Sequence, residues 1–281
     1  MTRKKTTGSC CRYRLIACFL RGFRRSYRIP AIVFWAAGNA LFVLFGRPFF
    51  RNRGARLAEQ TRIWAAGLTS ILGIEVRLYG VQDKKKNVTG LVVSNHTGYV
   101  DILTEAAAFG MRFTPKAEIR SWPVLGAYVQ LSDPVWIDRT SPRKSADVLE
   151  EFRKTLREGI PLLVYPEGTS TDGRSGLKPF KSTSFETVVG TTLPVQPVLV
   201  FYRTEEDDVS PAWYGDMTLM PHLWKILGNG KTVCEIHLLE PYFVPAGADR
   251  KQIMNEIRSR MSEQYDLILA RIRKEEESLS K

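Results

Sequence analysis

Residues 29 to 46, IPAIVFWAAGNALFVLFG, form a run of 18 residues without a charged side chain. With a helical rise of about 1.5 Å per residue, this length is at the lower limit for crossing the hydrocarbon core of a bilayer. A second uncharged stretch, residues 63 to 74, is too short to span. Basic residues flank the first run on both sides, so the positive-inside rule favours neither orientation strongly. The pattern indicates either one span or a helical hairpin dipped into one leaflet.

The positive charge of the chain lies at the same end. The first 58 residues hold 13 of the 41 Lys and Arg residues, and the first acid is Glu59. The remaining basic residues nearly balance the 29 acids, although the whole chain has a net charge of +12. A basic segment beside an apolar one suits an anionic bilayer surface. We therefore expect residues 1–74 to be a basic leader and membrane-associated helical hairpin on the cytoplasmic face of a membrane, the inner membrane if the source is bacterial.

Two other interpretations of this end remain open. An ordinary core helix with a solvated basic tail would show the same run. Nucleic-acid binding by the tail would explain the charge but not the apolar segments beside it, so we expect no nucleic-acid partner. A cleaved signal peptide is disfavoured, because the leader is long and arginines follow the apolar run in place of a small-residue cleavage site.

Residues 75–281 alternate between strand and helix patterns. Strands are predicted at 74–80, 91–94, 135–138, 160–168, 193–202 and 233–240, and helices at 101–109, 144–159 and 249–275. Pro194 and Pro197 lie within one strand pattern and indicate an edge or bulged strand. The alternation predicts an α/β domain with a mixed, mainly parallel sheet flanked by helices.

His96 has the surroundings of a functional histidine. It follows the buried run LVVS, and ligands of α/β sheets bind at the carboxyl ends of strands. Asp101 falls in the first turn of the next helix, where a carboxylate can hold one imidazole tautomer and stabilise an imidazolium. His222 is expected to cap or pack a helix start, and His237 to decorate a strand surface or an interface. The four cysteines show no metal-ligand spacing, so neither a metal nor a cofactor is expected.

Five ordered blocks carry a resemblance that is more specific than His-x4-Asp alone. They are NHTGYVD from Asn95, FTPKAE at 113–118, VWIDR at 135–139, YPEGTSTDG at 165–173 and LPVQPV at 193–198. Together they resemble the glycerolipid acyltransferase family typified by 1-acyl-glycerol-3-phosphate acyltransferases, over about residues 75 to 205.

The resemblance implies an enzyme that moves a fatty acyl group from acyl-CoA or acyl carrier protein to a lysolipid hydroxyl in membrane lipid biosynthesis. His96 would be the general base and Asp101 would orient it. No covalent acyl-enzyme is expected, since no serine or cysteine lies in a GxSxG motif. Backbone N–H groups around Gly168 are candidates for stabilising the oxyanion. The further candidates for binding acceptor or donor are Asn95, Lys116, Arg139, Glu167, Gly168, Thr169, Arg174, Lys178 and Lys181.

The block YPEGTSTDG departs from the resemblance. Family members often read Glu-Gly-Thr-Arg, with the arginine associated with the phosphate of the acceptor, whereas this chain has Ser170. Arg174, Lys178 or Lys181 could substitute. Just before the block VWIDR, Asp133 stands where a glycine is often found. Two acceptors therefore stay open: lysophosphatidic acid, favoured as the commoner activity, and a lysolipid without phosphate, such as lyso-ornithine lipid. A non-catalytic membrane lipid-binding protein is the alternative from another class, and the oligomeric state is not predicted.

Overall fold

The computed structural model describes residues 7–80, 88–123, 125–137 and 142–279. Within these residues six strands form one sheet in the order β1-β5-β4-β2-β3, with β6 paired to β4. Pairs β1–β5, β2–β3 and β2–β4 are parallel, while β4 is antiparallel to both β5 and β6. The predicted mixed, mainly parallel sheet is confirmed. The strands are β1 (Ile74–Tyr79), β2 (Leu91–Ser94), β3 (Leu162–Val164), β4 (Pro194–Thr204), β5 (Thr232–Leu238) and β6 (Tyr242–Phe243).

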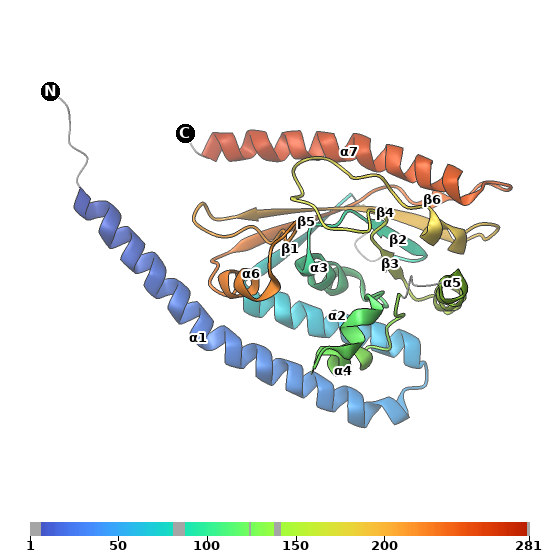
Figure 1. The fold of residues 1–281 in the computed structure, drawn as a ribbon, viewed down its shortest axis with the longest axis horizontal. Helices are drawn as coiled ribbons and strands as arrows, with labels where there is room; N and C mark the ends of the chain where they lie inside the picture. The colour runs from blue at the N-terminus through green and yellow to red at the C-terminus, as the bar shows by residue number, and fades with distance from the viewer. Residues whose placement is uncertain (1–6, 81–87, 124, 138–141, 280–281) are drawn as a thin grey trace.

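Helices cover both faces of the sheet (Figure 1). The long helix α7 lies along one face, and α2, α3 and α6 lie on the other, with α1 outside α2. The helices are α1 (Thr7–Gly46), α2 (Arg53–Leu72), α3 (Tyr99–Phe109), α4 (Leu125–Gln130), α5 (Pro142–Arg157), α6 (Leu219–Ile226) and α7 (Arg250–Leu279), joined by short 3-10 helices η1 (Arg47–Phe49), η2 (Ala117–Ser121) and η3 (Thr183–Thr187).

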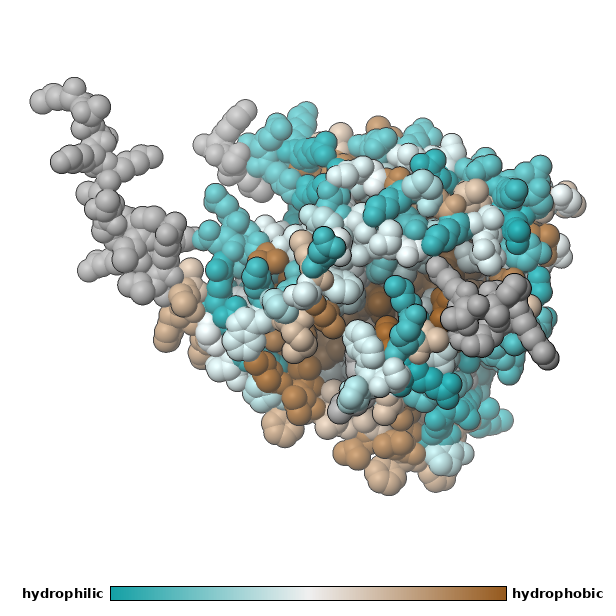
Figure 2. All heavy atoms as spheres, viewed as in Figure 1, coloured by the Kyte–Doolittle hydropathy of each residue, from teal (hydrophilic) through white to brown (hydrophobic). Residues whose placement is uncertain are grey.

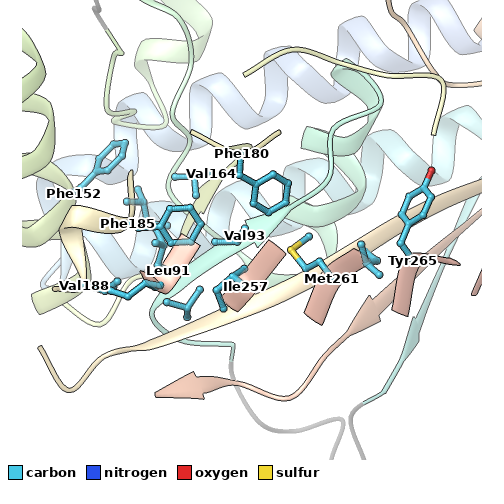
Figure 3. Close-up of a cluster of buried hydrophobic side chains, with 14 of the residues drawn as sticks. Leu91, Val93, Phe152, Val164, Phe180, Phe185, Val188, Ile257, Met261 and Tyr265 are labelled. Carbon is cyan, nitrogen blue, oxygen red and sulfur yellow. The ribbon is translucent and has the colours of Figure 1, made fainter. Parts of the chain in front are cut away.

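The sheet is buried on both faces because each face has its own apolar cluster. Leu91 and Val93 of β2 pack toward α7, where Ile257 and Met261 meet them (Figure 3). Val92 points to the opposite cluster, beneath α2 and α3. Alternation with a period of two therefore places successive residues of one apolar run in two different cores.

This two-sided burial corrects the interpretation of His237 as surface decoration. His237 is only 8% exposed, stacks on Tyr79 with ring centroids 4.7 Å apart, and lies 3.1 Å from a carboxylate oxygen of Glu235. Arg203 and Arg271 also contact Glu235, which is fully buried. These contacts tie α7 and β4 to β5, so the polar residues of this strand are a buried ion-pair network.

The expectation of an edge strand at 193–202 is also wrong, because β4 is central, whereas the bulged alternative agrees with the one-residue change of register around Pro197. It pairs with β2 on one side and with β5 and β6 on the other. Pro194 is its first residue, and Pro197 lies between the segment paired with β6, which ends at Val195, and the segment paired with β5, which begins at Val198. The missing N–H of Pro197 therefore falls where β4 changes partner.

The predicted strand at 135–138 is not a strand over its described residues. Ile137 forms one isolated bridge with Lys116, and Val135 donates to the carbonyl of Phe113. Residue 138 lies outside the described residues. Nearby, Asp133 has φ 53°, in the left-handed region where glycine is the unstrained residue.

Three arginines attach the first half of α1 to the α/β domain. Arg24, Arg25 and Arg28 donate hydrogen bonds to backbone carbonyls at the end of α6, those of Gly228, Trp224, Leu227 and Asn229. Carbonyls at a helix C-terminus lack intrahelical partners, so these cations satisfy them. After η1, the side chain of Asn52 caps α2 by accepting from the N–H of Ala55 at 3.2 Å. Helices α1 and α2 thus form a hairpin docked along the domain.

Candidate active site

The site begins where β2 ends. Ser94 is the last residue of this strand, and α3 starts at Tyr99. The intervening Asn95 is 1% exposed, and its side-chain amide donates to the carbonyl of Val200 at 3.1 Å and accepts from the N–H of Val200 at 2.7 Å. Asn95 therefore extends the β2–β4 pairing by one step through its side chain. This makes it a scaffold for His96, and a direct contact of Asn95 with a substrate stays a prediction.

His96 and Asp101 meet as the spacing predicts. His96 Nδ1 lies 2.9 Å from Asp101 Oδ2. The histidine side chain is 20% exposed while Asp101 is fully buried. Among the described residues Nε2 of His96 has no hydrogen-bond partner, so the nitrogen opposite the carboxylate is available to a ligand.

Asp101 accepts hydrogen bonds from four further donors. The N–H groups of Thr97 and Gly98 donate to Oδ2 at 2.5 and 2.9 Å. The hydroxyls of Thr97 and Tyr202 donate to Oδ1 at 2.6 and 3.0 Å. A buried carboxylate needs such compensation, and position N3 of α3 adds the favourable helix dipole. The loop therefore fixes the carboxylate before it contacts the imidazole.

Glu167 braces the same loop from the neighbouring strand. It is 4% exposed, accepts from the backbone N–H of His96 at 2.9 Å, and accepts from the N–H of Lys178 at 2.8 Å. Thr171 closes the contact by donating its N–H to the carbonyl of His96 at 2.8 Å. The strand ends of β2 and β3 thus carry one connected site, with His96 at its surface.

Comparison with known proteins identifies the family. The model of the Acyltransferase family matches residues 75–200. A lyso-ornithine lipid O-acyltransferase of Pseudomonas aeruginosa is 32% identical over 243 residues, which cover 84% of this chain and 90% of that protein. The chain belongs to the acyltransferase family. The resemblance of the five blocks is thereby confirmed.

The chain is also similar to a second curated relative and to a solved structure. A 1-acyl-sn-glycerol-3-phosphate acyltransferase of Neisseria meningitidis is 29% identical over 244 residues, covering 86% of this chain and 92% of that protein. The crystal structure of the 1-acyl-sn-glycerophosphate (LPA) acyltransferase PlsC from Thermotoga maritima has the same fold, with a TM-score of 0.64 at 20% identity, covering 88% of this chain and 97% of that one.

In this acyltransferase the predicted cationic candidates separate into free and engaged groups. Arg174 donates to both carboxylate oxygens of Glu276, at 3.0 and 2.8 Å, so its guanidinium is already paired. Lys178 and Lys181 are exposed; Lys178 Nζ lies 3.3 Å from the carbonyl of Ser170, and the Lys181 side chain lies over Gly168. These two lysines, with exposed Thr169, are the polar groups of the turn that a ligand can reach.

Lys116 is a candidate that the structure does not bring into this cluster. Lys116 is exposed at the start of η2, and its side chain has no contact with the His96–Asp101 pair within the described residues. Arg139 lies outside the described residues. The N–H of Gly168 donates to the carbonyl of Tyr165 at 3.1 Å and closes the turn, so this group is not free for an oxyanion. The neighbouring N–H groups of Thr169 and Ser170 remain the candidates.

Half-buried Tyr165 and the buried residues Glu105 and Tyr202, all close to His96, were missed by sequence reasoning. Tyr165 stacks on the imidazole, with ring centroids 4.0 Å apart and planes at 20°. Its hydroxyl donates to Glu105 Oε2 at 2.6 Å, and the Tyr202 hydroxyl reaches Asp101. Two signals were present: Glu105 lies four residues after Asp101 and thus on the same helical face, and Tyr165 directly follows a buried strand beside β2.

Burial shifts the pKa values of these groups. Desolvation, with the Asp101 charge as a second cause, raises the pKa of Glu105 to about 8, although the Tyr165 hydroxyl opposes the shift. Desolvation also raises the pKa of Glu167, against the backbone N–H groups of Lys178 and His96, which lower it. Within the described residues no group of three or more His, Cys, Asp or Glu side chains could hold a metal ion.

Proposed function

We propose that the protein transfers a fatty acyl group from a thioester donor, acyl-CoA or acyl carrier protein, to the free hydroxyl of a lysolipid, with His96 as the general base. The observation that carries this proposal is the His96–Asp101 contact at 2.9 Å, with Asp101 fully buried and Nε2 of His96 left open. Membership of the acyltransferase family supports the reaction type.

The reaction can be written on the groups of the site. Nε2 of His96 takes the proton of the acceptor hydroxyl while the oxygen of that hydroxyl attacks the thioester carbonyl carbon. The Asp101 carboxylate stabilises the imidazolium that forms. The tetrahedral intermediate collapses with cleavage of the carbon–sulfur bond, and the leaving thiolate takes the proton from Nε2. The N–H groups of Thr169 and Ser170 are our candidates for the oxyanion.

Lyso-ornithine lipid is the acceptor that we favour. Such lysolipids carry an amino-acid carboxylate and amine in place of a phosphate monoester. Ser170 donates its hydroxyl to the carbonyl of Trp213 at 2.6 Å and so holds a neighbouring loop, and Arg174 is paired with Glu276. Lys178 and Lys181 are point charges that can bind a carboxylate or a phosphate, so these cations do not choose between the acceptors, whereas Ser170 and the engaged Arg174 leave this turn without the bidentate guanidinium contact that the resemblance associates with a phosphate. Two relatives, from Pseudomonas aeruginosa and Rhodobacter capsulatus, are lyso-ornithine lipid O-acyltransferases at 32% and 36% identity.

Lysophosphatidic acid is the second candidate, supported by the acyltransferases of Neisseria that use 1-acyl-sn-glycerol-3-phosphate. Membranes containing the protein, given labelled acyl-CoA and each acceptor in turn, separate the two. We expect acylated ornithine lipid as the main product. Acylation of lysophosphatidic acid alone would contradict our choice and would establish the second candidate.

The hairpin supports action at a bilayer surface. Helices α1 and η1 together contain the one candidate span among the described residues, Ile16–Phe49, whose apolar window is only 6% buried. The exposed large apolar side chains of this span include Phe19, Phe23, Val33, Phe34, Leu41, Phe42, Leu44 and Phe45. Apolar residues gather along the lower edge of the molecule in Figure 2, where Figure 1 places α1. Because Arg24, Arg25 and Arg28 fasten α1 to the domain, we propose that the hairpin dips into one leaflet while the domain stays at the surface.

Release of free thiol tests the proposed function. With acyl-CoA and acceptor, wild type should release one thiol per lipid acylated, and His96→Ala should lower turnover by about 10²–10⁴-fold, the typical contribution of a general base. A loss of only a few-fold would contradict that role. A protein that binds both substrates without thiol release would be a non-catalytic lipid binder.

A further inference from the structure

The tyrosine stacked on His96 is connected to a second buried acid. Tyr165 directly follows β3, and its ring lies against the imidazole at a centroid distance of 4.0 Å. Its hydroxyl donates to Glu105 Oε2 at 2.6 Å. Glu105 is fully buried on α3, one helical turn after Asp101. The imidazole is therefore held at its edge by Asp101 and at its face by a tyrosine that is itself anchored.

Hydrogen-bond donors distinguish the two acids. Asp101 receives two backbone N–H groups and two hydroxyls besides the imidazole. Glu105 receives the Tyr165 hydroxyl, while its Oε1 faces the Ser94 side chain without a hydrogen bond of good geometry within the described residues. Two charges one helical turn apart in an apolar interior repel each other, so the acid with fewer donors keeps its proton.

We propose that Tyr165 and Glu105 are a positioning pair for His96: the tyrosine ring fixes the plane of the imidazole, and Glu105, as the uncharged acid, tethers the tyrosine hydroxyl. The inference rests on the proposed acyl transfer, since it concerns the geometry of its general base. Neither residue touches the reacting atoms, and both act through His96.

The pair has a pH limit that the surroundings set. The groups that face Glu105 are Asp101 on α3, Tyr165 after β3, Tyr202 on β4 and Cys234 on β5, none of them a cation. Burial and the Asp101 charge place the pKa of Glu105 at about 8. Above this pH both acids would be ionised, and two buried carboxylates cannot both remain without hydration. Glu105 must then recruit water or move, and the tethered ring moves with it.

The experiment compares Tyr165→Phe, Glu105→Gln and wild type, with Tyr265→Phe as the matched control. Tyr265 is also buried but lies in the cluster on the α7 side, and its hydroxyl has no partner among the described residues. Turnover at saturating substrates is measured from pH 6 to 9.5. We expect Tyr165→Phe to lower kcat roughly tenfold with little change in KM, the scale of one lost positioning hydrogen bond. Tyr265→Phe should behave as wild type.

The Glu105→Gln variant tests the charge. Its amide can still accept from Tyr165 but cannot ionise, so kcat near neutral pH should stay within about threefold of wild type and the fall above pH about 8 should disappear. If Glu105→Gln keeps the alkaline fall of wild type, or Tyr165→Phe keeps full kcat, the inference is wrong while the acyltransferase activity stands.

A measurement without substrate tests the same contact. In wild type the His96 ring protons, assigned by their loss in His96→Ala, should be shifted upfield in the NMR spectrum by the stacked ring of Tyr165. The shift should persist in Glu105→Gln and disappear in Tyr165→Leu. Unshifted His96 signals in wild type would overturn the stacking, whatever the activity assay shows.

Discussion

Replacing Asp101 by Asn isolates the charge of the site from its geometry. Oδ2 of Asp101 accepts from the backbone N–H groups of Thr97 and Gly98, which can only donate. Oδ1 accepts from the hydroxyls of Thr97 and Tyr202, which can rotate and accept a hydrogen bond instead. The amide nitrogen of Asn should therefore take the place of Oδ1. The remaining oxygen keeps its contact with His96 Nδ1, so the tautomer is retained and only the negative charge is lost.

The size of the effect follows from the charge separation. With the imidazolium and carboxylate charges centred roughly 4 Å apart, their attraction is about 4 kcal/mol at an effective dielectric constant of about 20. Only part of the imidazolium charge has developed in the transition state, so we expect kcat to fall by about 10²–10³-fold, at about 1.4 kcal/mol per factor of ten. KM should change little, because Asp101 is fully buried and meets no substrate.

The assay is thiol release at saturating donor and acceptor, with thermal unfolding as the folding control. Tyr202→Phe removes one of the two hydroxyls on Oδ1 and leaves the charge, so its kcat should fall only a few-fold. An Asp101→Asn protein that is folded and within tenfold of wild-type kcat would refute the charge argument. Equal losses of kcat in Asp101→Asn and Tyr202→Phe would indicate that the position of the side chain at 101, rather than its charge, supports turnover.

Three further perturbations test other parts of the structure. Glu105→Gln should remove a pH dependence of the free energy of unfolding. Because folding raises the pKa of Glu105 from 4.5 to about 8, the stabilisation by the protonated acid is complete below pH about 4.5 and is lost as the pH rises toward 8. If the melting temperatures of wild type and variant change in parallel with pH over this range, the prediction is contradicted. Arg28→Met leaves the carbonyls of Leu227 and Asn229 without their donor and should lower the free energy of unfolding by about 1–3 kcal/mol in denaturant titrations, whereas an unchanged midpoint would exclude the attachment of α1. Phe34→Asp with Phe45→Asp, both at exposed positions, should abolish flotation with anionic liposomes, and undiminished flotation would exclude α1 as the membrane contact.

The sequence predicts the parts of the site that are local. A buried run ending at Asn95, then a glycine and an aspartate in a helix start, place His96 and Asp101 within one loop, and the contact follows from that loop alone. The alternation of strands and helices predicts the layers for the same reason, because each element is amphipathic or buried by its own pattern.

Contacts between distant segments were beyond such reasoning. Tyr165 stacks on His96 only because β3 lies beside β2, and the hydrophobic periodicity of a segment does not predict the order of strands in the sheet. Pro197 favoured an edge strand in the sequence, but its missing N–H falls where β4 changes its pairing partner from β6 to β5. His237 is polar in pattern yet buried, because α7 covers that face with ion pairs. In each case the tertiary neighbour, which no single segment reveals, decides the outcome.

The most direct test of the central claim is a paired count of products from purified wild type and His96→Ala, each given acyl-CoA and lyso-ornithine lipid. Free thiol is measured with a colorimetric thiol reagent, and acylated lipid is measured by mass spectrometry in the same sample. The account predicts one thiol per acylated lipid for wild type, no acyl group left on the protein, and a loss of about 10²–10⁴-fold for the variant. Equal rates in the two proteins, or an acyl group bound covalently to the chain, would contradict direct transfer with His96 as the base.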